Sequence, residues 1–216
     1  MARARSEDFE LNRDGIKRAA AALFARQGFP GTSMADIARA CGISKPLLYH
    51  YVDDKYQLLL EIAVGHVSRL EALVGEVQAQ GLNPTEQLRR LVARFVQEYA
   101  EASDDHGVLT QDVRFLSDAD RNHVLDIERK IVAAFARTIA AVRPGLGADT
   151  LQQPLAMLLF GMINWMFTWF RPDGRLSQEQ MAPVVTDLFL GGLDAVRLPR
   201  SAETVQELVA SAGTHR

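Results

Sequence analysis

The amino-acid sequence predicts an all-α fold, and three observations support this prediction. Apolar residues recur every three to four positions along most of the 216-residue chain, which is the repeat of one helix face. Segments with the alternating pattern of a β-strand are nearly absent. Helix-ending sequences with glycine and proline, such as residues 81–84 and 143–145, divide the chain into about nine helical segments.

The first three helices are expected to form a small unit. A helix over residues 12–27 stops at a glycine, and Ser33 then caps a second, short helix. Gly42 lies in the following turn. Ser44 caps a third short helix with Pro46 in its first turn, where a missing N–H costs nothing. This order is typical of a helix-turn-helix unit, whose last helix reads DNA.

The remaining segments are predicted to form longer helices. Asp53 or Asp54 caps the first of them, Thr85 the second and Ser177 the last. A polar run over residues 103–107 is expected to interrupt the chain. The expected helices cover residues 55–79, residues from 85 to the polar run, and residues 108–116, 118–142, 151–170 and 177–196. We therefore divide the chain into a helix-turn-helix domain over residues 1–56, a helical domain over 57–198 and a polar tail over 199–216.

Composition and charge restrict the class of protein. The chain has 24 basic and 27 acidic residues and a net charge of −3, so binding to nucleic acid must be local. Cys41 is the only cysteine, which excludes an intrachain disulfide and a thiolate metal cluster, and we expect it to serve packing. The N-terminus lacks the apolar core of a signal peptide. A reducing cytoplasm is the expected setting.

A membrane partner is not expected. Residues 155–170 carry no charge, but the segment is shorter than the roughly 20 residues that span a bilayer. We interpret it as a helix that is buried on both faces.

Residues 44–55 combine basic and aromatic side chains at high density. Lysine and histidine can contact phosphates or base edges, and tyrosine hydroxyls can donate to phosphate oxygens. The simpler interpretation is an ordinary surface helix, which this stretch alone does not exclude.

Residues 1–56 closely resemble the DNA-binding domain of the TetR family of bacterial transcriptional regulators. The resemblance rests on many positions that match in order: residues 20–24, 28–29, 32–38, 42–45, 48–51 and Lys55. It implies a homodimer that binds a palindromic double-stranded DNA operator, with a ligand-binding and dimerisation domain over residues 57–198. A small molecule would release this repressor, and no cofactor is implied.

The resemblance also implies a set of DNA-binding residues. Two would hold phosphates at helix starts, three would bind the DNA backbone, and three lie where family members approach bases. The phosphate-holding residues are Thr32 and Ser44. The backbone-binding residues are Tyr49, Tyr51 and Lys55. The residues that approach bases are Lys45, Leu47 and His50. Ser33 is added as the residue that precedes the second helix.

A second resemblance concerns the effector. Residues 111–116, 161–165, 169–174 and 176–177 resemble a subgroup that senses acyl-CoA thioesters, such as regulators of fatty-acid, phenylacetate and steroid breakdown. The resemblance implies an acyl-CoA or aryl-CoA effector in an apolar slot, with Arg171 or Arg114 at its mouth for phosphates. The candidate ligand-binding residues are Phe95, Tyr99, Arg114, Phe115, Met157, Phe160, Asn164, Trp165, Trp169 and Arg171.

The dimer is expected to form through two apolar helices, 151–170 and 177–196. Each would pair with its mate in a four-helix bundle. The candidate dimerisation residues are Leu158, Val185, Leu188, Phe189, Gly192 and Leu193.

Three alternatives remain at this point. The aromatic residues assigned to the effector could be core, or the effector could be a hydrophobic drug-like or flavonoid-like molecule. A helical hydrolase using His106 or His123 is the third, but no nucleophile elbow, phosphate loop or metal signature supports it. No catalytic residue is therefore assigned. Asp104, Asp105, His106 and Asp112 lack fixed metal-ligand spacing and are interpreted as a solvated loop, so no metal site is predicted.

Overall fold

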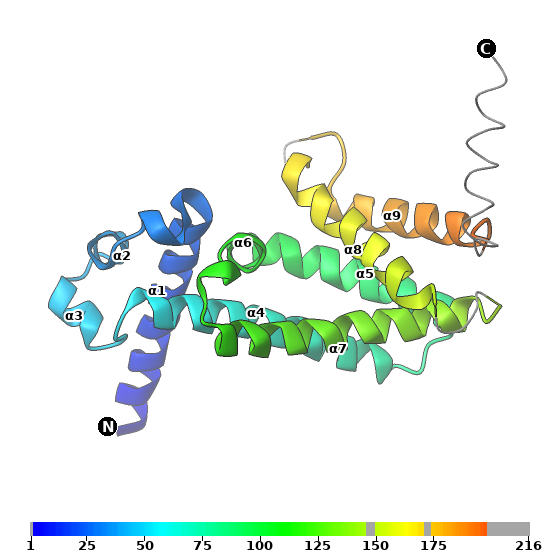
Figure 1. Cartoon of the computed structure of the whole chain (residues 1–216). Helices are drawn as coiled ribbons and strands as arrows, with labels where there is room; N and C mark the ends of the chain where they lie inside the picture. The colour runs from blue at the N-terminus through cyan, green and yellow to red at the C-terminus, as the bar shows by residue number, and fades with distance from the viewer. Residues whose placement is uncertain (1, 146–149, 171–173, 198–216) are drawn as a thin grey trace, which may run out of the picture. The chain divides into compact units, whose positions relative to one another are not determined.

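The computed structural model of the chain describes residues 2–145, 150–170 and 174–197. Within these ranges it contains nine α-helices, one 3₁₀-helix and no β-strand, which confirms the all-α prediction (Figure 1). The elements are α1 (Ala2–Gly31), α2 (Met34–Ala40), α3 (Lys45–Tyr49), α4 (Lys55–Gln78), α5 (Pro84–Glu101), α6 (Ser103–Gln111), η1 (Val113–Phe115), α7 (Asp118–Val142), α8 (Gln152–Trp169) and α9 (Gln178–Leu193). The predicted tail at 199–216 lies outside the described residues.

The chain divides into two compact units. The N-terminal unit contains Met1–Gly81 and Arg94–Ile131, and the C-terminal unit contains Leu82–Ala93 and Val132–Arg216. The domain boundary that we predicted after residue 56 falls inside the N-terminal unit, near the start of α4, and it stays a prediction.

Helix α1 is longer than expected and bends near its end. Residues 2–11 extend it towards the N-terminus, and they include alanine, arginine and glutamate, which favour helix. Gly28 has φ 76° and ψ 155°, a non-helical conformation that glycine adopts at little cost. One further turn follows to Gly31. The predicted stop at Gly28 is therefore a bend in the helix.

Two predicted helix starts are wrong. Helix α5 begins at Pro84, because proline suits the first helical position, and the side-chain oxygen of Asn83 accepts from the backbone N–H of Glu86 at 3.0 Å. Thr85 is thus inside the helix. Helix α6 occupies the run at 103–107 that we expected to interrupt the chain. Asp104 and Asp105 lie in its first turn, where carboxylates interact favourably with the helix dipole.

Each unit has its own buried apolar residues. In the N-terminal unit Phe24, Ile37 and Leu48 are almost fully buried, and they join α1, α2 and α3 around one core. In the C-terminal unit the rings of Phe135 and Phe160 lie 4.7 Å apart between α7 and α8. No helix within the described ranges combines the length and hydropathy needed to cross a membrane.

Candidate nucleic-acid interface

Helix α3 presents one buried and several exposed side chains. Ser44 accepts a hydrogen bond from the backbone N–H of Leu47 at 3.3 Å, which confirms it as the N-cap. Leu48 is 0% exposed and anchors the helix, whereas Leu47 is 43% and Tyr49 46% exposed. Lys45 is exposed as well, and its amino group lies 5.8 Å from the centre of the Tyr49 ring. The helix therefore offers basic and aromatic groups to a partner.

Helix α2 and the following turn hold α3 in place. The Ser33 hydroxyl accepts from the backbone N–H of Asp36 at 3.2 Å, and the Asp36 carboxylate accepts from the backbone N–H of Ser33 at 3.0 Å. These contacts form the predicted capping box, and hydrogen bonds from Ser33 lower the pKa of Asp36. Gly42 has φ 67°, a left-handed conformation that lets the chain turn sharply into α3.

Two of the residues assigned to DNA have internal roles in this structure. Thr32 is 2% exposed, and its hydroxyl donates to the carbonyl oxygen of Gly28 at 2.9 Å. The amino group of Lys55 donates to the carbonyl oxygens of Phe29 at 2.8 Å and Thr32 at 2.9 Å. Their side chains thus contact the end of α1 in this structure, and their assignment to DNA stays a prediction.

The other assigned residues are arranged more favourably. His50 and Ser33 are exposed, and Tyr51 is partly exposed. The rings of His50 and Tyr51 lie 5.8 Å apart, and the Tyr51 hydroxyl accepts a hydrogen bond from Asn12 at 3.4 Å. That contact connects the segment after α3 to α1. The exposed side chains among the assigned residues are centred on α3 and its two ends.

The candidate effector residues of the N-terminal unit belong to two different surroundings. Phe95 and Tyr99 are buried, at 0% and 3% exposure, and their ring centres lie 5.9 Å apart. Arg114 and Phe115 are exposed on η1, with the guanidinium carbon 5.0 Å from the centre of the Phe115 ring. Phe115 also packs against Phe29 at 5.6 Å. One part of the predicted slot is therefore core, and the other part is surface.

A buried histidine pair beside Tyr99 was not predicted. His66 and His106 are 0% and 6% exposed, their ring nitrogens lie 3.3 Å apart, and Tyr99 stacks on His106 at 3.7 Å. Burial lowers the pKa of His66 to about 3 and that of His106 to about 4. His106 thus lies in a packed helix and not in the solvated loop that we predicted. Only a three-dimensional contact joins these two residues, 40 positions apart.

The candidate effector residues of the C-terminal unit also differ in burial. Phe160 is 8% exposed, while Met157, Trp165 and Trp169 are between 53% and 69% exposed. The side-chain oxygen of Asn164 is buried and has no hydrogen-bond partner among the described residues. Arg171 lies outside the described residues.

The candidate dimerisation residues occupy two sides of α8 and α9. Leu158 and Leu188 are 64% and 67% exposed, and Gly192 is exposed as well. Three others are buried within the single chain: Val185, Phe189 and Leu193. Other exposed apolar residues lie at helical spacing on the outer side, namely Met157, Trp165 and Val184. We call Met157, Leu158, Trp165, Val184 and Leu188 the outer apolar face.

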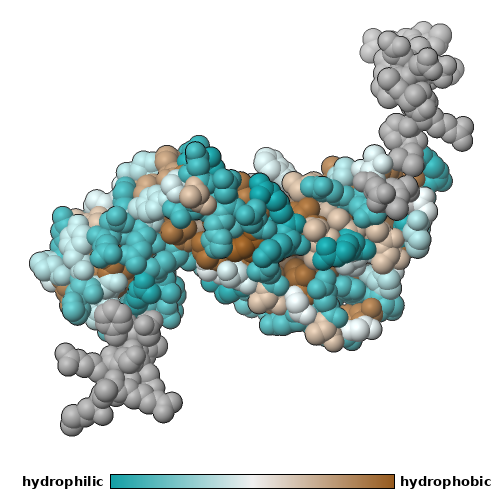
Figure 2. Space-filling model, turned by 60° about the horizontal axis from the view of Figure 1, so that its bottom comes forward, coloured by the Kyte–Doolittle hydropathy of each residue, from teal (hydrophilic) through white to brown (hydrophobic). Residues whose placement is uncertain are grey.

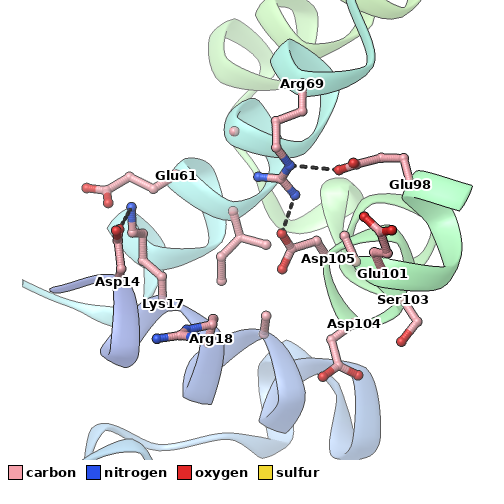
Figure 3. A pocket seen from close by; sticks show the side chains of 14 residues that line it. Asp14, Lys17, Arg18, Glu61, Arg69, Glu98, Glu101, Ser103, Asp104 and Asp105 are labelled. Carbon is pink, nitrogen blue, oxygen red and sulfur yellow. Dashed lines mark hydrogen bonds and ion pairs between the residues drawn. The ribbon is translucent and has the colours of Figure 1, made fainter. Parts of the chain in front are cut away.

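A charged cleft of about 680 Å³ lies inside the N-terminal unit, between α1, α4, α5 and α6 (Figure 3). Arg69 donates to Glu98 at 2.8 Å and to Asp105 at 2.6 Å across it, and Lys17 pairs with Asp14 at 2.6 Å. Its acidic residues outnumber its basic ones, so an anionic ligand is not favoured. Across the described ranges, no group of three histidine, cysteine or acidic residues could hold a metal ion.

Two family models match the chain. The model described as "Bacterial regulatory proteins, tetR family" matches residues 16–62, which include α2, α3 and the start of α4. The model described as "Tetracyclin repressor-like, C-terminal domain" matches residues 81–193. Together they cover both parts of the predicted organisation.

Similar proteins come from several bacteria. The chain is 26% identical over 177 residues to the HTH-type transcriptional repressor KstR2 of Rhodococcus jostii (strain RHA1), covering 81% of this chain and 87% of that protein. A TetR-family transcriptional regulator from Bordetella parapertussis 12822 has 36% identity and a TM-score of 0.80, covering 87% of this chain and 98% of that one. The structure of AibR in complex with isovaleryl coenzyme A and operator DNA has 28% identity and a TM-score of 0.73, covering 82% of this chain and 97% of that one.

Proposed function

We propose that this chain, which belongs to the TetR family of bacterial regulatory proteins, is a homodimeric repressor that a coenzyme A thioester releases from a palindromic operator. Family membership makes the chain a transcriptional regulator and not an enzyme. The observation that carries the DNA-binding part is α3, a short helix fixed by one buried leucine and surrounded by exposed basic and aromatic side chains.

Helix α3 suits the major groove of DNA. Lys45, Leu47 and His50 can approach base edges, while Tyr49 and Ser44 can contact phosphates. A single five-residue helix provides few contacts, and the net charge of the whole chain is −3. Strong binding therefore needs two copies, whose α3 helices would enter successive major grooves roughly 34 Å apart.

The outer apolar face supports the dimer. Apolar side chains that are at least half exposed are costly to leave in water, and these lie on one side of each helix. Added Cβ atoms at Gly161 and Gly192 would meet nothing within 4 Å, so the backbone there is open to close approach. A second copy presenting the same face satisfies both features through a two-fold axis.

Two observations favour a coenzyme A thioester as the effector. AibR, a relative of known structure, was solved with isovaleryl coenzyme A and operator DNA. The buried side-chain oxygen of Asn164 has no donor among the described residues, as expected of a group that meets a ligand or water. The charged cleft of the N-terminal unit is a poor site for such an anion, so the thioester belongs elsewhere.

Release requires that the effector bind one conformation more tightly than the other. In our proposal the ligand-filled protein holds its two α3 helices at a separation that no longer matches one turn of DNA.

Operator binding can be tested with the full-length protein. Duplexes enriched from a random pool by the wild-type chain serve as the probe, and fluorescence anisotropy measures their affinity. The variant Tyr49→Ala is expected to bind at least tenfold more weakly, because it removes an exposed contact without disturbing Leu48. Gln97→Ala on α5, which changes an exposed residue far along the chain, is the control. Equal affinity of Tyr49→Ala and wild type would show that α3 does not contact DNA.

The effector is tested by calorimetric titration with a panel of acyl-CoA and aryl-CoA thioesters and with a flavonoid. Binding of a thioester that also lowers operator affinity supports the proposal. Asn164→Ala should weaken that binding, since the buried oxygen would no longer contact the ligand. Binding of the flavonoid alone would instead support the hydrophobic effector that the sequence left open.

A further inference from the structure

The backbone of Phe29 is held from two directions. The bend at Gly28 breaks the helical pattern of α1, and the N–H of Phe29 donates to the carboxylate of Asp112 at 3.1 Å. The carbonyl oxygen of the same residue accepts from the amino group of Lys55 at 2.8 Å. Both polar backbone atoms of Phe29 are thus bound by side chains from other elements, Asp112 after α6 and Lys55 at the start of α4. All of these residues belong to the N-terminal unit.

Asp112 is an unusual residue for a structural contact. It follows directly after α6, it is 4% exposed, and burial raises the pKa of its carboxyl group. A buried carboxylate is costly unless it is hydrogen-bonded. The N–H that it accepts is 83 residues away in sequence and becomes available through the bend at Gly28. The bend at Gly28 thus supplies the N–H donor that the buried carboxylate of Asp112 needs.

Lys55 makes the second attachment, at the first residue of α4. Besides the two carbonyl oxygens, its amino group lies 4.4 Å from the centre of the Phe29 ring. The next residue, Tyr56, donates to Asp120 at 2.5 Å and accepts from the backbone N–H of Ser117 at 2.8 Å. The start of α4 is therefore bonded to the end of α1 on one side and to the start of α7 on the other.

The Phe29 side chain adds apolar contacts to the same place. Its ring lies 5.4 Å from that of Phe24 in α1 and 5.6 Å from that of Phe115 in η1. We call Gly28, Phe29, Lys55, Asp112 and Phe115 the Phe29 joint. It connects the end of α1, just before α2 and α3, to α4 and to the corner between α6 and η1.

We propose that Asp112 is a positioning residue for operator binding, which through the Phe29 joint fixes the direction in which α2 and α3 leave α1. This inference rests on the proposed function, because it concerns two α3 helices that must match two half-sites. Asp112 touches no DNA. A loose joint lets each α3 take several positions, so the dimer accepts half-sites at several separations. A firm joint selects one separation.

Spacing selectivity is the property to measure. Full-length wild-type protein enriches its best duplex from a random pool, and duplexes with the half-sites moved by one or two base pairs then give a ratio of affinities. We expect the affinity of the wild-type protein to fall at least tenfold when the half-sites move by one base pair. The affinity of Asp112→Ala should fall no more than about threefold for the same shift. Asp112→Asn keeps an oxygen acceptor for the Phe29 N–H and should restore the wild-type ratio.

Control variants separate positioning from general destabilisation. Asp104→Ala removes an exposed carboxylate from α6 and should keep the wild-type ratio. Lys55→Met cuts the other attachment and should broaden spacing as Asp112→Ala does, which keeps the test decisive if the Asp112 variant does not fold. Since the ratio compares duplexes with one protein, a uniform loss of affinity leaves it unchanged.

The outcomes distinguish the joint from the proposed function. Folded Asp112→Ala or Lys55→Met protein with the sharp spacing of wild type would overturn the positioning role alone. Failure of wild-type protein to enrich any duplex would overturn the proposed function, and this inference with it. Broad spacing in both variants, restored in Asp112→Asn, supports the joint.

Discussion

The segment α2–α3 and the pair α8–α9 expose opposite kinds of surface. The first exposes mainly polar, basic and aromatic tips around a single buried leucine, and each helix start is capped. The second exposes leucine, methionine and tryptophan, and Figure 2 shows hydrophobic residues interspersed among hydrophilic ones on one face of the molecule. The difference indicates that the surface of α3 suits reversible contact with a polar partner, whereas the outer apolar face suits a permanent contact.

The largest expected effect comes from charging the outer apolar face. Leu158→Glu combined with Leu188→Glu should give monomers in sedimentation velocity and weaken operator binding by about 100-fold or more, because linked half-site contacts are lost. Ala72→Glu, an exposed alanine on α4, is the control. A dimer that survives both glutamates would mean that another face holds the copies together.

The next largest effect should be a different sensitivity of the two regions to acid. The buried, neutral histidines lie in the N-terminal unit, and α8 and α9 contain none. Their folded pKa values, about 3 and about 4, are below the unfolded value, so the unfolded state binds more protons under acid. The contribution of each neutral histidine to the free energy of unfolding is therefore fully present above about pH 6.5 and is lost as pH falls towards 4. At pH 5 the loss is roughly 2 kcal/mol per histidine.

Urea denaturation at pH 7 and pH 5 measures this loss. Arg69, Glu98 and Tyr99 also face the histidine pair, so His66→Gln is compared with His123→Gln, which changes an exposed histidine. His66→Gln should show the smaller difference between the two pH values. An equal pH dependence in all three proteins would assign acid sensitivity to other groups.

Removing charge from α3 should have a smaller effect than removing the dimer. Lys45→Ala is expected to cost about 1 to 3 kcal/mol per half-site if it reads a base, with altered sequence preference. If it binds phosphate, the affinity loss is uniform across duplexes and the slope of log affinity against log salt falls by about 0.9 for each contact. Lys130→Ala, at an exposed lysine on α7, should leave both quantities unchanged.

The smallest effects should come from the two matched capping boxes. Ser33 caps α2 and Ser177 caps α9 with the same hydrogen-bond pattern. Changing either to alanine should lower the free energy of unfolding by about 1 kcal/mol. Only Ser33→Ala should also weaken operator binding, since α2 supports α3. Thermal melting and anisotropy on both variants provide the check, and a matching affinity loss in Ser177→Ala would contradict it.

Local chemistry made much of the fold predictable. The caps at Ser33, Ser44 and Ser177 were recognised because their partners lie three residues away in sequence. Helix existence followed from apolar spacing, and the domain order followed from resemblance. The contacts that were not predicted have the opposite character. The internal hydrogen bonds of Thr32 and Lys55 depend on a bend at Gly28 that the sequence does not specify.

The candidate sites were less predictable than the helices. Val185 and Leu188 both fit an apolar stripe, yet one is 7% and the other 67% exposed, because α9 is apolar on two sides. Periodicity alone does not say which side packs inward. Asp112 was interpreted as part of a solvated loop, because its partner N–H lies 83 residues away. Sequence patterns identify short-range partners and leave long-range ones to the structure.

The half-buried amino group of Lys55 has a consequence for chemical reactivity. The chain has four lysines, and acylating reagents attack the neutral amine. An ammonium that donates to two carbonyl oxygens and faces an aromatic ring is shielded from reagent. Lys55 should therefore label more slowly than exposed Lys45 and Lys130. Its labelling rate reports how often the end of α1 separates from α4, without any knowledge of operator or effector.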